Sequence, residues 1–171
     1  MTNLRRTLSL FAVAFVVMIT AACGSASPGA SFAEIELKGL EGGSTQIAAP
    51  GAPRALNLWA TWCAPCRAEL PTFDAVAADL AARSSDVSII GINVGDSDLD
   101  AKALVDELGL SFEQLLDPNA SVQRELRITG MPATIFVDAT GEVLDIHNGE
   151  LTRPELEELL SALLGAAFDG Q

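Results

Sequence analysis

The chain has few of the residues that bind metal ions or build disulfide frameworks. It holds one histidine, His147, and three cysteines among 171 residues. A structural zinc site takes about four ligands, so we expect no metal. His147 falls on a predicted strand, where we expect a structural or solvent-facing role.

Positive charge is also scarce. The chain has 10 Lys and Arg against 23 Asp and Glu, a formal net charge of −13. Nucleic acid binding requires a basic surface, so we expect no nucleic acid partner. Anionic lipid headgroups would also repel such a chain, whereas basic protein partners would suit it.

A third absence is an apolar run of comfortable membrane-spanning length. Residues 8–22 are uncharged and follow Arg5 and Arg6, but about fifteen apolar residues suit a signal peptide better than a span. The small residues before Cys23 resemble the lipobox of bacterial lipoproteins, with Thr20 at the place of the usual Leu. We therefore predict a signal peptide over residues 1–22 and lipid on Cys23. Ordinary secretion and an uncleaved anchor are the alternatives, and all three place the protein outside the cytoplasm.

The rest of the chain predicts one α/β domain. Residues 23–31 are small and polar, which predicts a flexible tether. We expect the domain to span residues 32–165 and a C-terminal tail to follow at residues 166–171. Apolar periodicity predicts strands at 32–37, 44–48, 55–59, 87–94, 112–116, 133–137 and 142–147, and helices at 64–83, 99–108, 120–126 and 152–164. The order predicts a central mixed sheet with helices on both faces and an N-terminal β-hairpin extension.

Two cysteines, Cys63 and Cys66, lie where the helix at 64–83 is expected to begin. The first thiol would sit near the unpaired N–H groups and the positive end of the helix dipole, which stabilise a thiolate. The second lies one turn on, close enough to attack a mixed disulfide formed by the first. Pro65 suits the first helical turn. An inert structural staple is the alternative, although so short a loop constrains the unfolded chain little.

Residues 57–71 resemble the active-site segment of the thioredoxin superfamily, above all its membrane-anchored TlpA/ResA-like branch. Met131 and Pro132, about 65 residues beyond the second cysteine, resemble the cis-proline loop of that family. The resemblance implies a thioredoxin-like fold and a thiol-disulfide oxidoreductase whose only redox group is the Cys63–Cys66 disulfide. It also implies that Cys63 attacks the partner's disulfide and that Cys66, the more buried of the two, resolves the mixed disulfide.

Two further positions separate the branches of this superfamily. Thioredoxins carry a buried Asp in the strand before the motif, whereas this chain resembles the TlpA/ResA-like branch in having Asn57 there. That branch carries an acid after the next strand, usually Glu, and here the matching residue is Asp96. We expect Asp96 to handle protons in catalysis or, alternatively, to cap the following helix.

Other site residues follow from the same resemblance. Trp62 is expected to pack beside the sulfur and shape the docking face, with core filling as the alternative. Pro132 in cis would turn the backbone of Met131 toward an extended partner segment. The spacer residues Ala64 and Pro65 help to set the reduction potential.

The family's usual task is to reduce disulfides of exported proteins, including apocytochrome c before haem attachment, with electrons from a membrane thiol carrier. A disulfide donor for folding secreted proteins is the alternative with the same chemistry. A copper-handling module would resemble CxxxC with a well-placed His, and a peroxidase would resemble Thr-x-x-Cys without the second cysteine. We expect a monomer.

Overall fold

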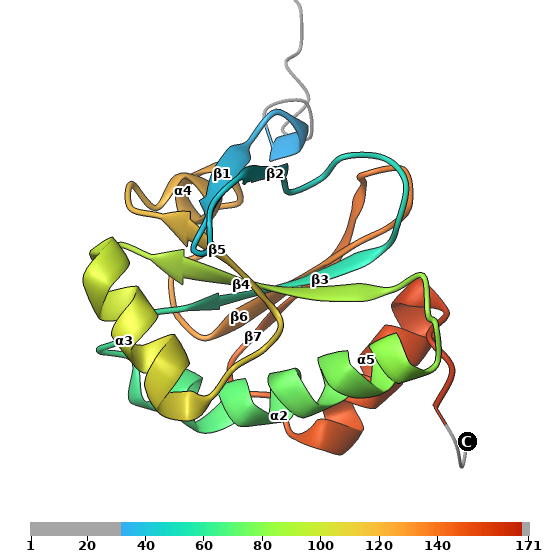
Figure 1. Ribbon diagram of the computed structural model, residues 1–171. Coiled ribbons are helices and arrows are strands. Elements are labelled where there is room, and N and C mark those ends of the chain that lie inside the picture. The colour runs from blue at the N-terminus through green and yellow to red at the C-terminus, as the bar shows by residue number, and fades with distance from the viewer. Residues whose placement is uncertain (1–31, 169–171) are drawn as a thin grey trace, which may run out of the picture.

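The computed structural model describes residues 32–168 (Figure 1). The predicted signal peptide, the tether and Cys23 lie outside these residues. Within the described part, no helix is both long enough and apolar enough to cross a membrane. Seven strands form one sheet in the order β2-β1-β5-β4-β3-β6-β7. Their bounds are β1 Glu36–Gly39, β2 Ser44–Gln46, β3 Arg54–Trp59, β4 Ser88–Val94, β5 Glu113–Asp117, β6 Ala133–Val137 and β7 Val143–Asn148.

The sheet is mixed, as the element order predicts. β3, β4 and β5 run parallel, whereas β6 is antiparallel to β3 and β7 is antiparallel to β6. The N-terminal hairpin joins the sheet through β1, which pairs antiparallel with β5. The end of β3 therefore has the end of β4 on one side and the start of β6 on the other. Trp59 pairs with Asn93, and Leu58 pairs with Ala133.

Three helices cover one face of the sheet and one short helix lies on the other (Figure 1). The covering helices are α2 Ala64–Ala82, α3 Asp98–Leu108 and α5 Arg153–Leu164, and the short one is α4 Ser121–Glu125. α2 contains Pro71 and continues through it. α3 begins after Ser97, whose side chain accepts from the N–H of Asp100, and ends at Gly109 with φ 64°. The left-handed conformation at such an end favours glycine.

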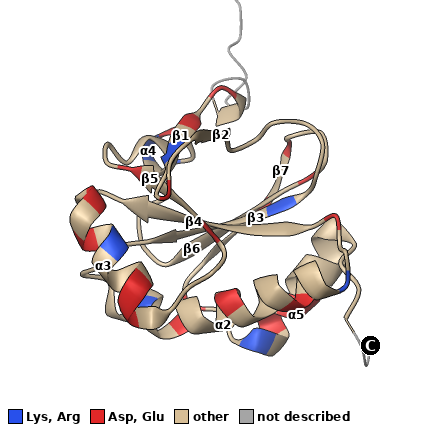
Figure 2. Cartoon of the chain, in the orientation of Figure 1, with Lys and Arg blue, Asp and Glu red and all other residues tan. Residues whose placement is uncertain are grey.

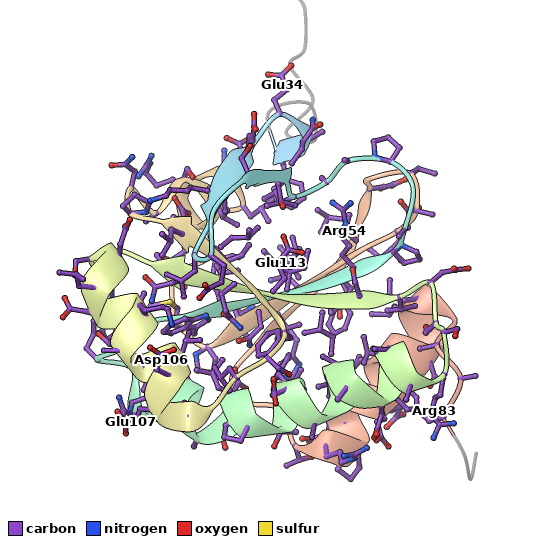
Figure 3. All side chains as sticks on the ribbon, viewed as in Figure 1. Glu34, Arg54, Arg83, Asp106, Glu107 and Glu113 are labelled. Carbon is purple, nitrogen blue, oxygen red and sulfur yellow. A yellow bond between two sulfur atoms is a disulfide. The ribbon has the colours of Figure 1, made fainter. Side chains whose placement is uncertain are left out.

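The alternation of side chains along β3 divides the core into two layers. Leu56 and Leu58 pack into the cluster on the α4 side, whereas Ala55 and Trp59 pack toward the helices α2, α3 and α5. Side chains fill the space between the sheet and α2 (Figure 3). Because successive residues of a strand face opposite sides, a strand covered on both faces is apolar throughout, as residues 55–59 are except for Asn57.

The predicted boundaries differ from the structure at both ends of the domain. Residues 32–37 were expected to be a strand, but Phe32 and Ala33 are helical and β1 begins at Glu36. The N–H of Ile35 donates to the carbonyl of Phe32 at 3.1 Å, and this turn accompanies the burial of the Phe32 ring in the core. At the other end, packing continues to Phe168, beyond the boundary predicted at residue 165.

Candidate active site

The loop after β3 places Cys63 at the N-terminal cap of α2. Cys63 is extended, with φ −85° and ψ 98°, and its carbonyl accepts the N–H of Arg67 at 3.1 Å. Its Sγ accepts the N–H of Cys66 at 3.3 Å. A side chain at this position satisfies one of the unpaired N–H groups of the first turn. Pro65 lies in that turn, where a missing N–H costs nothing. The helix start predicted from the sequence is confirmed.

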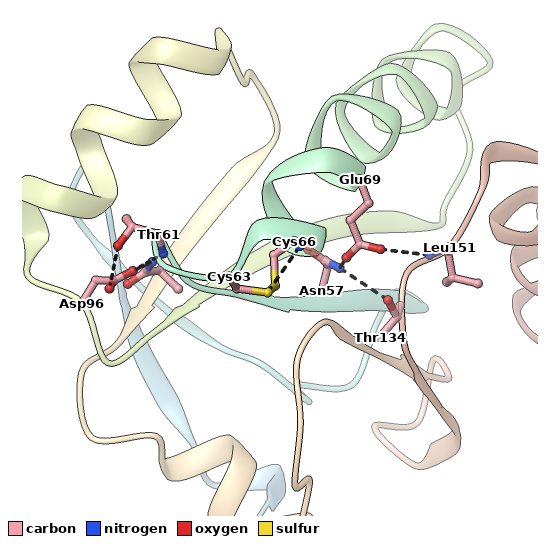
Figure 4. The surroundings of a disulfide bond; sticks show 9 residues. Asn57, Thr61, Cys63, Cys66, Glu69, Asp96, Thr134 and Leu151 are labelled. Atoms are coloured by element: carbon pink, nitrogen blue, oxygen red, sulfur yellow. Dashed lines mark hydrogen bonds between the residues drawn. A yellow bond between two sulfur atoms is a disulfide. The ribbon is translucent and has the colours of Figure 1, made fainter.

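Cys63 and Cys66 form a disulfide, with 5.3 Å between their Cα atoms (Figure 4). Cys63 is 4% exposed and Cys66 is fully buried, so an incoming sulfur reaches the first more easily. Trp62, next to the disulfide, is 71% exposed, which excludes a role in filling the core.

Trp59 is buried in the same cluster as the two cysteines. Its Nε1–H donates to Oε1 of Gln114 on β5 at 2.9 Å. Gly91 on β4 leaves room for that amide, because a Cβ there would lie 2.0 Å from Oε1. The indole is thus held by a side chain of β5, which reaches it across β4.

Met131 and Pro132 are joined by a cis peptide bond, as the family resemblance predicts. Pro132 immediately precedes β6, whose first residue Ala133 pairs with Leu58 near the end of β3. The Met131 side chain packs against the cluster that contains both cysteines. The structure therefore brings the CxxC motif and the cis-proline loop to the same edge of the sheet.

Asp96 lies in the loop between β4 and α3 and contacts the loop that leads into the disulfide. Its carboxylate accepts from the Thr61 N–H at 2.7 Å, from the Thr61 hydroxyl at 2.9 Å, and from Nδ2 of Asn93 at 2.7 Å (Figure 4). Ser97, not Asp96, caps α3. The alternative that Asp96 is merely a helix cap is therefore wrong.

Glu69 is a site residue that the sequence analysis missed. It lies three residues after Cys66 on α2 and is only 1% exposed. Its carboxylate accepts from Nδ2 of Asn57 at 2.8 Å and from the N–H of Leu151 at 3.0 Å. Burial raises the pKa of Glu69 from 4.5 to about 7, against the lowering effect of these two hydrogen bonds, and nearby Glu150 adds to the rise.

Because residues three apart on a helix share a face, the Glu69 carboxyl lies on the Cys66 side of α2 (Figure 4). The available signal was its place on the apolar face, directly before Leu70 and one turn before Phe73. An acid on that face points toward the sheet.

Asn57 connects this carboxyl to β6. Its Nδ2 also approaches the Thr134 hydroxyl at 3.5 Å, and its Oδ1 has no hydrogen-bond partner among the described residues. Thr134 pairs with His147 on β7. Within residues 32–168, no cluster of three or more His, Cys, Asp or Glu side chains could hold a metal ion.

Residues 28–146 match the AhpC/TSA family. The chain belongs to this family. It is 30% identical over 128 residues to the thiol-disulfide oxidoreductase ResA of Halalkalibacterium halodurans, across 74% of this chain and 72% of that protein. It is 34% identical over 118 residues to a thiol:disulfide interchange protein, a DsbE homolog, of Paracoccus denitrificans, across 64% of this chain and 62% of that protein. The structure of MTB DsbF superposes with a TM-score of 0.69 and 30% identity, covering 78% of this chain and 97% of that one.

The family and the fold agree with the geometry of the site. The protein is a thiol-disulfide oxidoreductase with a thioredoxin-like fold, and the resemblance to the TlpA/ResA-like branch is confirmed.

Proposed function

We propose that the protein reduces disulfide bonds of exported proteins outside the cytoplasm, with Cys63 as the attacking thiolate and Cys66 as the resolving thiol. The observation that carries the proposal is the position of Cys63 as the cap of α2, where its Sγ accepts the Cys66 N–H at 3.3 Å. The same N–H groups and helix dipole stabilise a thiolate there once the disulfide is reduced.

The reaction consists of two thiol-disulfide exchanges. The Cys63 thiolate attacks one sulfur of the partner's disulfide, which breaks that bond, forms a mixed disulfide and releases one partner thiolate. The Cys66 thiolate then attacks the Cys63 sulfur, forms the Cys63–Cys66 disulfide and releases the second partner thiolate. Two electrons pass to the partner, and its two thiolates take up the protons that the enzyme thiols lose.

The surrounding residues have separate tasks in this proposal. Trp62 and the backbone of Met131, exposed by cis Pro132, bind the partner segment around its cysteine. The spacer Ala64-Pro65 helps to set the reduction potential. Asp96 holds the loop before Trp62.

The cellular setting follows from the N-terminal sequence and the family. We propose that residues 1–22 are removed, that Cys23 carries lipid, and that a membrane dithiol carrier re-reduces the enzyme. Apocytochrome c before haem attachment is one expected partner class, no cofactor beyond the disulfide takes part, and the protein acts as a monomer.

The two cysteine variants test the assignment as a matched pair. Cys63→Ser should abolish reduction of insulin disulfides, because the attacking sulfur is gone. Cys66→Ser should also stop turnover but accumulate mixed disulfides with its partners, visible on non-reducing gels of the cell envelope. Full activity in Cys63→Ser, or trapping by Cys63→Ser instead of Cys66→Ser, would contradict the attacking and resolving roles of the two thiols.

The direction of electron flow is tested by the reduction potential. A value near about −270 mV favours a reductant, whereas a value near about −120 mV favours a disulfide donor. Equilibration of the purified protein with glutathione or dithiothreitol measures it, and the higher value would replace the proposal with the oxidant alternative.

A further inference from the structure

Two large apolar side chains stand in solvent in the segments that follow β3 and β4. Trp62 is 71% exposed and Leu99 is 82% exposed, and the other large exposed hydrophobic residue of the described chain is Leu144 at 42%. A single exposed leucine is ordinary on a soluble protein. The relevant fact is where Leu99 lies.

A carboxylate ties the loop that carries Trp62 to the loop that leads into α3, the helix of Leu99. Asp96 accepts from the N–H and hydroxyl of Thr61, at 2.7 and 2.9 Å, and Thr61 directly precedes Trp62. Leu99 follows Asp96 by three residues and lies in the first turn of α3. The loops leave the carboxyl ends of the adjacent parallel strands β3 and β4, an edge at which open α/β sheets bind ligands. Figure 4 shows the Thr61–Asp96 contact to one side of the disulfide.

The surface around Leu99 is acidic. Asp98 and Asp100 flank it, and α3 carries four acidic residues against one lysine. Acidic residues predominate on α3 in Figure 2. Three of these acids are paired with basic side chains of this chain: Asp98 with Lys38, Asp106 with Lys102 and Glu107 with Arg67. Asp100, next to Leu99, has no such ion pair among the described residues and is the carboxylate that would attract a positively charged partner.

We propose that Leu99 and Trp62 form one docking surface for a segment of the disulfide-bearing partner that has a bulky apolar side chain and a Lys or Arg beside its cysteine. The proposal rests on the function proposed above and adds the class of substrate. The apolar side chain covers Leu99, while the basic side chain lies against Asp100.

Two disulfide peptides of equal length test the proposal, one with Leu and Lys beside the cysteine and one with Ser and Glu. The parent should show the higher kcat/KM for the Leu/Lys peptide. Leu99→Ser should lower that kcat/KM about tenfold, mainly through KM, which is the size expected for burying much of one leucine. The loss for the Ser/Glu peptide should be clearly smaller. Leu144→Ser, at the exposed leucine on β7, is the matched control and should behave as the parent.

The salt dependence of kcat/KM tests whether the basic residue of the partner contributes to docking. Raising the ionic strength from about 0.05 M to about 0.5 M should lower kcat/KM for the Leu/Lys peptide and not for the Ser/Glu peptide, because salt screens exposed charges. The same salt response for both peptides would remove the basic residue from the proposed substrate class.

The remaining outcomes separate this inference from the proposed function. Reduction of neither peptide by the parent defeats both. Equal kcat/KM for the two peptides, equal losses in Leu99→Ser, or a matching loss in Leu144→Ser defeats the docking surface alone. A concentration-dependent dimer in sedimentation, broken by Leu99→Ser, would assign the surface to a second copy of the chain and overturn the proposal.

Discussion

Two carboxylates lie on opposite sides of the disulfide, and their surroundings differ. Asp96, on the solvent side, is half-buried and accepts three hydrogen bonds from Thr61 and Asn93. Glu69, on the inner side, is 1% exposed and accepts two hydrogen bonds. Burial dominates at Glu69 and raises its pKa to about 7. Residue type alone therefore does not set the pKa of a buried acid, because hydrogen-bond donors lower it and desolvation raises it.

The difference assigns separate tasks to the two acids. Glu69 changes its protonation state near neutral pH on the same helix face as Cys66, so we propose that it exchanges a proton with the resolving thiol. Asp96 joins the loop after β4 to the loop before Trp62, so we propose that it is a positioning residue. This role replaces the proton-handling role expected for Asp96 as our preferred hypothesis, and the substitutions below test both.

The largest expected effect on the free energy of unfolding is at Glu69. A folded-state pKa raised above the unfolded value means that the folded protein binds the proton more tightly. Its stabilising contribution is therefore complete below about pH 4.5 and is lost as the pH rises to about 7. The rise corresponds to about 3 kcal/mol at 1.36 kcal/mol per pKa unit. Glu69→Gln removes this pH-dependent loss, because an amide does not titrate. Turning the Asn57 amide keeps the hydrogen bond between the two side chains, since its unpartnered Oδ1 then accepts from the new NH2 group.

Urea unfolding at pH 5 and pH 8 measures the effect as a difference between parent and variant. Relative to the parent, Glu69→Gln should gain stability at the higher pH. If Glu69 exchanges a proton with the resolving thiol, the pH profile of disulfide exchange should show an inflection near 7 in the parent and none in Glu69→Gln. Glu107→Gln, at an exposed carboxylate paired with Arg67, is the control. Parallel pH curves for parent and Glu69→Gln would show that Glu69 does not titrate in this range.

Substitutions of Asp96 should change the free energy of unfolding less, and the Ala and Asn variants should differ from each other. Asp96→Ala leaves the Thr61 N–H and the buried Asn93 amide without their acceptor, which should cost about 1–3 kcal/mol. Asp96→Asn keeps an acceptor for both if its Oδ1 faces them, while its amide donates to the Thr61 hydroxyl. A positioning role therefore predicts that Asn restores most of the stability and of the kcat/KM for protein disulfides. Activity as low in Asp96→Asn as in Asp96→Ala would instead support proton handling.

The sequence predicted the reactive part of the site well, because local rules determine it. The CxxC at a helix start follows from the rules for helix termini. The Met-Pro before a strand was found through the family resemblance, which also supplies its distance from the CxxC. Asp96 was found through the same resemblance. Its contact with Thr61, however, depends on the conformations of the two loops that follow the neighbouring strands β3 and β4. That contact involves residues 35 apart in sequence, and no local pattern encodes it.

Glu69 was missed for a different physical reason. On an amphipathic helix an acid usually faces water, and the exposed acids of α3 and α5 follow that rule. Glu69 breaks it because Asn57 on β3 and the N–H of Leu151 offer donors inside the core. Besides the place of Glu69 on the apolar face of α2, the core asparagine Asn57 was a second sign that a buried acceptor lay opposite.

The smallest expected effect is at Thr134, and it tests which partner holds Asn57. The Asn57 Nδ2 lies 2.8 Å from Glu69 but 3.5 Å from the Thr134 hydroxyl. A hydrogen bond that long contributes little, and valine fills the same volume on an interior strand. Thr134→Val should therefore change the free energy of unfolding by less than about 1 kcal/mol and leave the pH dependence due to Glu69 intact. Urea unfolding at pH 5 and pH 8 checks both. If Thr134→Val instead flattened the pH dependence as Glu69→Gln does, Thr134 would be the group that orients Asn57 toward the buried acid.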